Sequence, residues 1–327
     1  MTSRTTLIFG AAAALLLSQA VVAAGQAAYP MKPVRMIVPI APSDDADITA
    51  RALAQKLTEA WGQQVIIDNR AGAGGIVGLE MGARAAPDGY TITQASIGPL
   101  AVTPALHSRL PYDSLRDFDP ITRGVSALNV LVVHPSLPVN SVKDLIAHAR
   151  ANPGKLSFGS SGAGRADHLA GELFNQQAGV KMQHVPYKGG APAMIDLVAG
   201  NVQLIFATVS TAIAHMKSGR IRTIAMTSAK RSDLLPGVPT VAEAGVPGFE
   251  VENWYGIAFP AGTPKPITAQ VHREINRILA LPDVKERLGN LGIAPFPTAT
   301  PQEFGVYVRS EMKKYAELVR SAGITAD

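Results

Sequence analysis

The chain has no cysteine among its 327 residues, and charged residues make up only 17% of it. The lack of cysteine excludes a disulfide scaffold, a thiol nucleophile, a cysteine zinc site, an iron–sulfur cluster and a lipid-modified N-terminal cysteine. The net charge of +5 is small and dispersed, and no stacking motif accompanies it, so nucleic acid is not an expected partner. Glycine and proline stay below the share typical of low-complexity chains, and the length suits two globular domains.

Long apolar runs are missing except at the N-terminus. There, Arg4 precedes the apolar stretch Leu7–Ala24, and small residues follow it. This order is typical of a secretory signal peptide, which we place at residues 1–28. Polar residues and a glycine interrupt the stretch and no basic cluster follows, which argues against an uncleaved membrane anchor. We therefore expect an exported, soluble protein in the periplasm of a bacterium.

Short β-rich runs alternate with helical runs of about ten residues along the rest of the chain. Expected strands are 34–40, 64–68, 90–95, 128–133, 157–160, 183–185, 204–207 and 224–227, and expected helices are 48–61, 76–86, 141–150, 167–178, 191–199, 211–218 and 300–322. This alternation predicts an α/β fold whose sheets are mostly parallel and flanked by helices. The scheme occurs twice, with Ile121–Val133 and Phe249–Phe259 as crossing strands. We therefore expect lobe 1 at 29–127 plus 254–327 and lobe 2 at 128–253.

The loops that follow the strands are the candidate binding loops, because open α/β sheets bind ligands beyond the carboxyl ends of their strands. One such loop is the glycine-rich segment Ser160–Arg165, between a strand and a helix. Glycines let backbone N–H groups converge at a helix N-terminus, and such a nest binds anions, carboxylates included. Arg165 adds a charged contact that can be bidentate. A tight turn with solvated serines explains the same residues equally well.

The first strand–helix loop instead gathers three acids, Asp44, Asp45 and Asp47. Acids at a helix start complement the helix dipole, so we expect Asp45 or Asp47 to cap the helix. In the alternative interpretation, one of these acids faces the cleft and meets a cationic group.

The remaining motifs do not support catalysis or cofactor binding. The glycine turn of residues 69–78 resembles a dinucleotide fingerprint but carries Val77 where the last glycine belongs. None of the seven histidines forms a His-x-x-x-His or His-Glu-x-x-His pair, so neither a metal nor a cofactor is expected. Ser160 and Ser161 lack the spacing of a nucleophile elbow.

Short segments spread over the whole chain after the signal peptide match one known family in order. They are Tyr29-Pro30 with Lys32-Pro33, Asp68-Asn69-Arg70 with Ala73-Gly74-Gly75, Ala86-Pro87-Asp88-Gly89-Tyr90-Thr91, Leu110-Pro111-Tyr112-Asp113, Gly154-Lys155-Leu156, His168-Leu169-Ala170-Gly171-Glu172-Leu173-Phe174, His184-Val185-Pro186-Tyr187-Lys188-Gly189, Pro239-Thr240-Val241-Ala242-Glu243-Ala244-Gly245 and Pro260-Ala261-Gly262-Thr263-Pro264. Together they resemble the Bug (TctC-like) extracytoplasmic solute receptors of tripartite tricarboxylate transporters. So many ordered matches are more specific than any single motif.

The resemblance implies a two-lobed fold similar to type II periplasmic binding proteins, with a hinge and a cleft between the lobes. It implies binding of a small carboxylate without catalysis, through backbone amides, bridging waters and hydroxyls of two strand–helix loops. The ligand-binding residues expected on this basis are Ala41, Ser43, Asp44, Asp45, Ser96, Ser160, Ser161, Gly162, Ala163, Gly164, Arg165, Ala166, Asp167, Tyr187 and Thr208.

Two features depart from the family pattern. Ser43-Asp44-Asp45 stands where members usually carry glycines, and Arg165 stands where a small hydroxyl residue is common. Two acids beside a bound carboxylate would repel it unless they are paired. We therefore expect Asp44 or Asp45 either to pair with Arg165 across the cleft or to meet an amine on the ligand, such as that of an amino acid.

The sequence thus predicts a monomeric receptor that closes around a small organic carboxylate and delivers it to membrane permease subunits. Two alternatives stay open. One is a ligand-sensing adaptor for a periplasmic sensor kinase, and the other is an exported hydrolase that uses Ser160 or Ser161 as its nucleophile.

Overall fold

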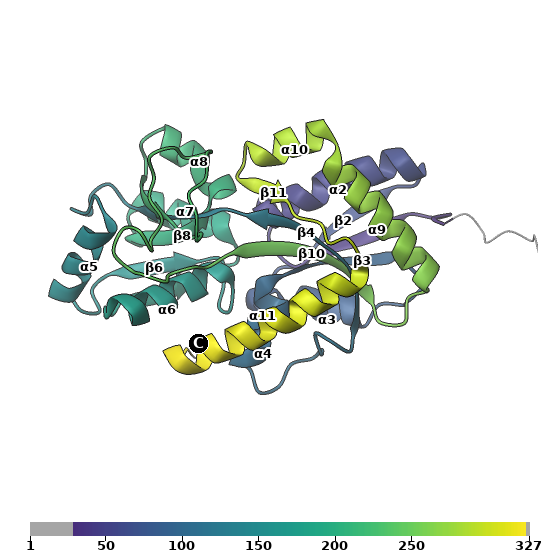
Figure 1. Ribbon diagram of the computed structural model, residues 1–327, viewed down its shortest axis with the longest axis horizontal. Helices are drawn as coiled ribbons and strands as arrows, with labels where there is room; N and C mark the ends of the chain where they lie inside the picture. Colours follow the sequence, from purple (N-terminus) through teal and green to yellow (C-terminus); the bar gives the residue numbers. More distant parts are fainter. Residues whose placement is uncertain (1–28, 325–327) are drawn as a thin grey trace, which may run out of the picture.

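A computed structural model describes residues 29–324, so the expected signal peptide at 1–28 lies outside the described residues. Within the described range the chain forms two sheets flanked by helices, and they lie side by side along the long axis of the molecule (Figure 1). The expected two-lobed α/β fold is confirmed. Both sheets are mixed, whereas the sequence predicts mostly parallel ones, because the crossing strands run antiparallel to their neighbours.

The first sheet has the strand order β11-β4-β10-β3-β1-β2. Its strands are β1 (Val34–Val38), β2 (Val65–Asn69), β3 (Thr91–Ser96), β4 (Phe118–Ala127), β10 (Asn253–Pro260) and β11 (Ile293–Pro295). β1 is parallel to β2 and β3, whereas β10 runs antiparallel between β3 and β4. The carboxyl ends of β1 and β3 therefore meet the amino end of β10 at one edge of the sheet.

The second sheet has the order β7-β6-β8-β5-β9. Its strands are β5 (Asn129–Val133), β6 (Ser157–Ser160), β7 (Gln183–Pro186), β8 (Leu204–Thr208) and β9 (Arg222–Met226). The sheets are flanked by α2 (Asp45–Trp61), α3 (Ile76–Ala83), α4 (Thr103–Leu106), α5 (Val142–Ala151), α6 (Ala166–Ala178), α7 (Gly190–Ala199), α8 (Val209–Lys217), α9 (Lys265–Ala280), α10 (Pro282–Gly289) and α11 (Pro301–Ala322). Only Leu128 separates β4 from β5, so one nearly continuous strand passes between the sheets (Figure 1).

Local sequence sets where several helices begin and end. α2 ends at Gly62, whose left-handed φ of 64° favours a residue without Cβ. Ser141 and Thr300 cap α5 and α11, each by accepting a hydrogen bond from the backbone N–H three residues on. Thr240 and Glu243 form a reciprocal capping box, with bonds of 3.0 and 3.1 Å, but only a turn follows it.

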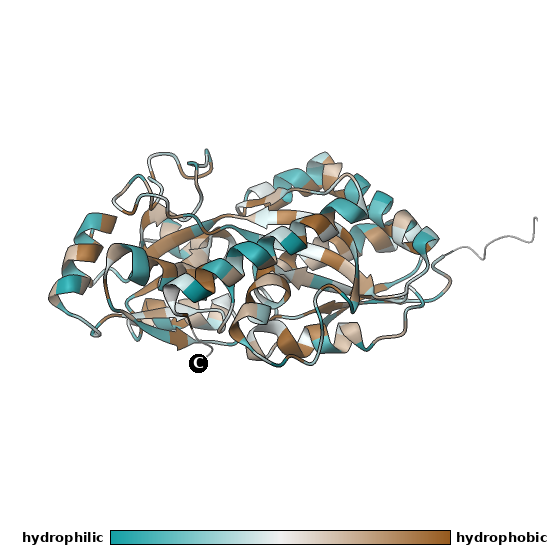
Figure 2. Cartoon of the chain, turned by 60° about the horizontal axis from the view of Figure 1, so that its bottom comes forward, coloured by the Kyte–Doolittle hydropathy of each residue, from teal (hydrophilic) through white to brown (hydrophobic). Residues whose placement is uncertain are grey.

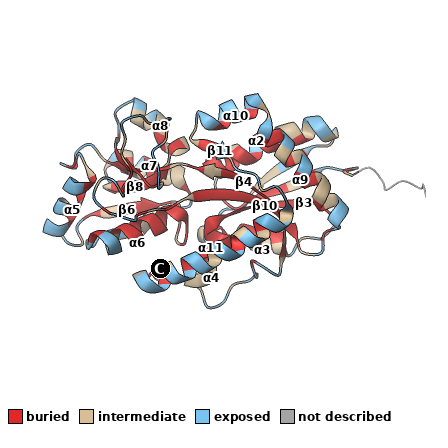
Figure 3. Cartoon of the chain, viewed as in Figure 1, coloured by how far each residue is buried: buried red, intermediate tan, exposed pale blue. Residues whose placement is uncertain are grey.

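The strands form the core, and the helices cover them with their apolar faces. The strands are largely apolar in Figure 2 and buried in Figure 3, whereas the outward helix faces are largely polar and exposed. β10 is buried at every position, because β3 and β4 flank it and helices cover the sheet. Its Trp254 donates a hydrogen bond from Nε1 to Oε2 of Glu311 in α11, at 2.9 Å. The longest helix is thereby tied to the strand that approaches the second sheet.

Two regions contain elements that the periodicity argument did not identify. α9, α10 and β11 fill residues 265–295, and a turn of π-helix at Gly98–Val102 leads into α4. The predicted strand at 249–259 is shorter, because β10 begins only at Asn253.

Candidate functional site

A pocket lies where loops from the two sheets meet. Its wall is formed by the β1–α2 loop, the ends of β3 and β8, the starts of α6 and α7, and the start of β10. The pocket holds about 20 Å³ of free space, which is room for individual water molecules. An organic ligand therefore needs the lobes to separate or the wall side chains to move.

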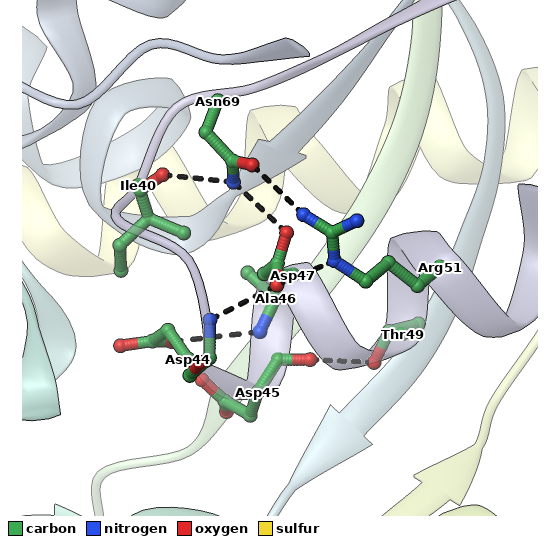
Figure 4. A network of polar contacts seen from close by, with 9 residues as sticks. Ile40, Asp44, Asp45, Ala46, Asp47, Thr49, Arg51 and Asn69 are labelled. Atoms are coloured by element: carbon green, nitrogen blue, oxygen red, sulfur yellow. Dashed lines mark hydrogen bonds and ion pairs between the residues drawn. The ribbon is translucent and has the colours of Figure 1, made fainter. Parts of the chain in front are cut away.

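The N-terminus of α2 carries three acids in different roles (Figure 4), and Asp44 and Asp45 line this pocket. Asp44 is the capping residue, with Oδ1 accepting a hydrogen bond from the Ala46 N–H at 3.4 Å. The expectation that Asp45 or Asp47 caps the helix is therefore wrong. Asp47 instead accepts from the backbone N–H of Ser43, from Arg51 and from Asn69, each at 2.9 Å. Burial alone would raise the pKa of Asp47, but these donors lower it below its usual value.

Asp44 also reaches across to the other sheet. Its Oδ2 accepts a hydrogen bond at 3.2 Å from the backbone N–H of Gly190, the first residue of α7. Gly189, the residue before α7, has no side chain to cap that helix. A carboxylate at a helix N-terminus is stabilised by the unpaired N–H groups and by the dipole. Asp44 thereby links α2, beside the first sheet, to α7, beside the second.

Asp45 is fully buried at the base of the same pocket. Tyr255 donates a hydrogen bond from Oη to Oδ1 of Asp45 at 2.8 Å, and Asn253 donates from Nδ2 to Tyr255 Oη at 2.8 Å. Oδ2 of Asp45 is buried and receives no hydrogen bond from an N–H or O–H donor of residues 29–324. Burial, followed by the neighbouring Asp44 carboxylate, raises the pKa of Asp45 well above its usual value.

The loop before α6 supplies the pocket with its buried cation, Arg165. Its Nε donates to Ser161 Oγ at 2.9 Å. Burial alone would lower the pKa of Arg165, but Tyr255, Asp44 and other nearby acids raise it. No ion pair within 4.0 Å joins Arg165 to Asp44 or Asp45 in the described part of the chain, so the expected direct pair is not formed. The attraction between these groups acts over a longer distance.

Asp167 holds this loop in shape. Its two carboxylate oxygens accept hydrogen bonds from the backbone N–H groups of Ser161 and His168. Burial raises the pKa of Asp167, while Arg165 and the Ser161 bond act in the opposite direction. The acid therefore fixes the backbone that presents Arg165.

Ser160 does not line the pocket. It is fully buried, its Oγ lies 2.6 Å from Nε2 of His184, and it accepts a hydrogen bond from the Gly162 N–H at 3.2 Å. A second histidine fixes the turn at Gly164, because Nδ1 of His168 accepts a hydrogen bond from the Gly164 N–H at 3.0 Å. A serine buried in this way does not present a nucleophile to a substrate, and this argues against a hydrolase that uses Ser160.

The glycine turn of residues 72–75 packs against the Ser160–Arg165 loop. At Gly74, with φ of 63°, a Cβ would lie 2.2 Å from the carbonyl oxygen of Ala163. A second cavity of about 40 Å³ lies beside this contact, lined by the turn, Arg165 and Tyr187. The hydroxyl of Tyr187 donates to Asp196 at 2.7 Å. The close packing of the turn against this loop explains the glycines better than a nucleotide site does.

About half of the expected ligand-binding residues line the pocket. Those that line it are Asp44, Asp45, Ser96, Ser161, Arg165, Ala166, Asp167 and Thr208. Those outside its wall are Ala41, Ser43, Ser160, Gly162, Ala163, Gly164 and Tyr187. Wall residues that sequence reasoning missed are Ile97, Gly98, Asn129, Gly190, Ile205, Ala207, Thr211, Asn253 and Tyr255. For Asn253 and Tyr255, the sequence offers one signal: Asn253-Trp254-Tyr255 is a polar and aromatic stretch inside a predicted crossing strand.

No helix among residues 29–324 is long and apolar enough to span a membrane. No group of three or more His, Asp or Glu side chains in that range is arranged to hold a metal ion.

Comparison with known proteins places the chain in a family. The profile of the tripartite tricarboxylate transporter family receptor, TctC, matches residues 49–324. A protein from the tcbD-tcbE intergenic region of a Pseudomonas species is 41% identical, over 89% of this chain and 87% of its own length. Protein BugT of Bordetella pertussis is 37% identical over 90% of both chains. The structure of R. palustris Rpa4515 with adipate superposes with a TM-score of 0.88 at 35% identity, over 91% of this chain and 99% of that one. The chain therefore belongs to the TctC family of tripartite tricarboxylate transporter receptors, which are periplasmic solute-binding proteins.

Proposed function

We propose that this protein binds a small organic carboxylate in the pocket between its lobes and delivers it to the membrane subunits of a tripartite tricarboxylate transporter. In this proposal lobe 1 comprises 29–127 plus 254–327 and lobe 2 comprises 128–253. The composition of the two sheets supports that division, because β5 to β9 all fall within the second range.

The observation that carries the proposal is the buried cation at the junction of the lobes. Arg165 is 6% exposed, lies at the start of α6 and lines the pocket together with the start of α7. Helix N-termini and a guanidinium both favour a bound carboxylate. Rpa4515, which is similar over nearly the whole chain, has a dicarboxylate, adipate, in its structure. The proposed binding residues are therefore the pocket-lining members of the expected set, with Ser160 and Tyr187 shaping the wall from outside.

The working cycle follows from the size of the pocket. Because free space of about 20 Å³ does not accommodate an organic acid, the lobes open to admit the ligand and close over it. The proposed protein acts as a monomer in the periplasm, needs no catalytic residue, and presents the closed form to the transporter.

Thermal-shift screening of small mono- and dicarboxylates, followed by calorimetry of the compounds that stabilise the protein, tests the proposal. A ligand at 100 times its dissociation constant adds about 2.7 kcal/mol of stability, which gives a clear rise in melting temperature. Arg165→Gln should remove that rise, whereas Arg84→Gln, on the exposed surface, should not. If no carboxylate shifts the melting temperature, or if Arg165→Gln keeps the full shift, the proposed function is wrong.

A further inference from the structure

The pocket contains several buried polar atoms that the protein does not pair. Oδ2 of Asp45, Oγ of Ser96 and both amide atoms of Asn129 have no hydrogen-bond partner within the described residues. The three side chains are at most 3% exposed, and all three line the pocket. Leaving a buried polar atom unpaired costs about 1–3 kcal/mol, so these atoms are suited to contact a ligand. They include both acceptors and donors.

The charges around these atoms are separated within the site. Arg165 lines both the pocket and the neighbouring cavity beneath the glycine turn, whereas Asp44 and Asp45 line only the pocket. The acids and the arginine are more than 4.0 Å apart. The site therefore offers a negative region and a positive region that do not neutralise each other by direct contact.

The negative region contains a buried carboxylate oxygen that no donor of the described residues reaches. That atom is Oδ2 of Asp45, and Asp44 lines the same pocket. Burial and the neighbouring Asp44 carboxylate raise the pKa of Asp45 well above its usual value, so a positive group beside the two acids is favoured. The remaining groups around Asp45 that carry or can take a charge are Tyr255, which donates to it, and Arg165, which attracts it from a distance. Asp167 acts on Arg165 but is occupied by backbone N–H groups.

Building on the receptor function proposed above, we propose that the pocket selects ligands that carry both a carboxylate and a protonated amine, and that the ammonium group lies beside Asp44 and Asp45. The ligand carboxylate lies toward Arg165 and the start of α6. The ammonium donates to the Asp45 oxygen that otherwise has no donor and to Asp44.

A plain dicarboxylate fits the same site less well. It places no donor on Asp45, and it brings a second negative charge toward two acids.

Calorimetry of the full mature chain with matched acids tests the proposal. Glutarate is compared with glutamate, and adipate with 2-aminoadipate, at pH 7. We expect the amine-bearing member of at least one pair to bind at least tenfold more tightly than the plain acid.

Variants identify the residue responsible. Asp45→Asn keeps the shape of the side chain but removes its negative charge, and it should remove the preference for the amine-bearing acids. Glu59→Gln, on the exposed face of the same helix, should leave that preference unchanged. If the plain acids bind as tightly as their amine-bearing partners, or if Asp45→Asn keeps the full preference, the inference is overturned and the receptor function stands. If neither member of either pair binds, while other carboxylates do, the inference fails in the same way. If no carboxylate of any kind binds, the receptor function fails as well.

Discussion

Gly74 is the position where a single added methyl group should prevent the lobes from closing. It lies in the turn between β2 and α3, beside the first sheet, and it touches the loop between β6 and α6 of the second sheet. In Gly74→Ala the new Cβ would lie 2.2 Å from the carbonyl oxygen of Ala163. Because that atom belongs to backbone, no side-chain rotation relieves the contact.

The size of the effect follows from the distances. Real Cβ contacts are essentially never shorter than 3.0 Å, so the turn and the loop must separate from 2.2 to at least 3.0 Å, a shift of about 0.8 Å. Overpacking of this kind typically costs about 1–3 kcal/mol. That cost falls on the closed form, in which the two loops touch, and it weakens binding by about 5- to 150-fold.

Gly62→Ala separates this steric effect from backbone strain. Gly62 has φ of 64° and ψ of 10°, almost the same as the 63° and 13° of Gly74, but a Cβ there would meet nothing within 4 Å. Both variants therefore lose about 1–2 kcal/mol through the left-handed conformation. Only Gly74→Ala should also weaken ligand binding. Calorimetry with the tightest-binding acid measures the affinity of each variant. X-ray scattering of the ligand-bound protein measures how far the lobes close. Equal affinities for the two variants, with equal radii of gyration, would refute the reasoning.

Three further predictions concern stability. Ser43 has a left-handed φ of 71° and an exposed side chain, so Ser43→Gly should raise the free energy of unfolding in urea by about 0.5–1 kcal/mol, and a decrease would contradict the strain argument. Asp45 has a raised pKa when folded, so its contribution to stability is present below its unfolded pKa and is lost as pH rises toward the folded value. Asp45→Asn should therefore gain stability relative to wild type between pH 5 and pH 8 in urea unfolding, and parallel curves would exclude this linkage. Thr300→Ala removes the cap of α11 and should lower stability by about 1 kcal/mol, whereas an unchanged urea midpoint would show that the Thr300 cap is not needed.

The parts of the fold that sequence predicts are those decided by local chemistry. Gly62 ends α2 and Ser141 caps α5, because a left-handed backbone and an unpaired N–H need particular residues. The direction of the crossing strands, in contrast, is not decided by local chemistry. Whether β10 enters the first sheet parallel or antiparallel depends on residues far away in the chain, so the run of apolar residues is the same in both cases.

The capping of α2 shows the same limit at the scale of one residue. Any of three neighbouring acids satisfies the composition rule for a helix start. Asp44 takes the role in a structure where its second oxygen also accepts from Gly190, beside the other sheet. Asp47 is occupied by Arg51 and Asn69 on the opposite side. Contacts that are distant in sequence thus decide among residues that are locally equivalent.

The pairing register of the two crossing strands explains why some residues of the pocket wall are not predicted from the sequence. Ser96 was expected from its place at the end of a strand, and it lies opposite Tyr255 in the β3–β10 pairing. Thr208 was expected for the same reason, and it lies opposite Asn129 in the β5–β8 pairing. Both missed residues occur near the starts of buried strands, where a local rule predicts only core. A loop-based search for binding residues therefore finds one side of each pair, and the strands that join the lobes supply the other. The strands that connect the lobes also line the pocket, so in the proposed receptor function ligand contact and lobe movement act on the same strands.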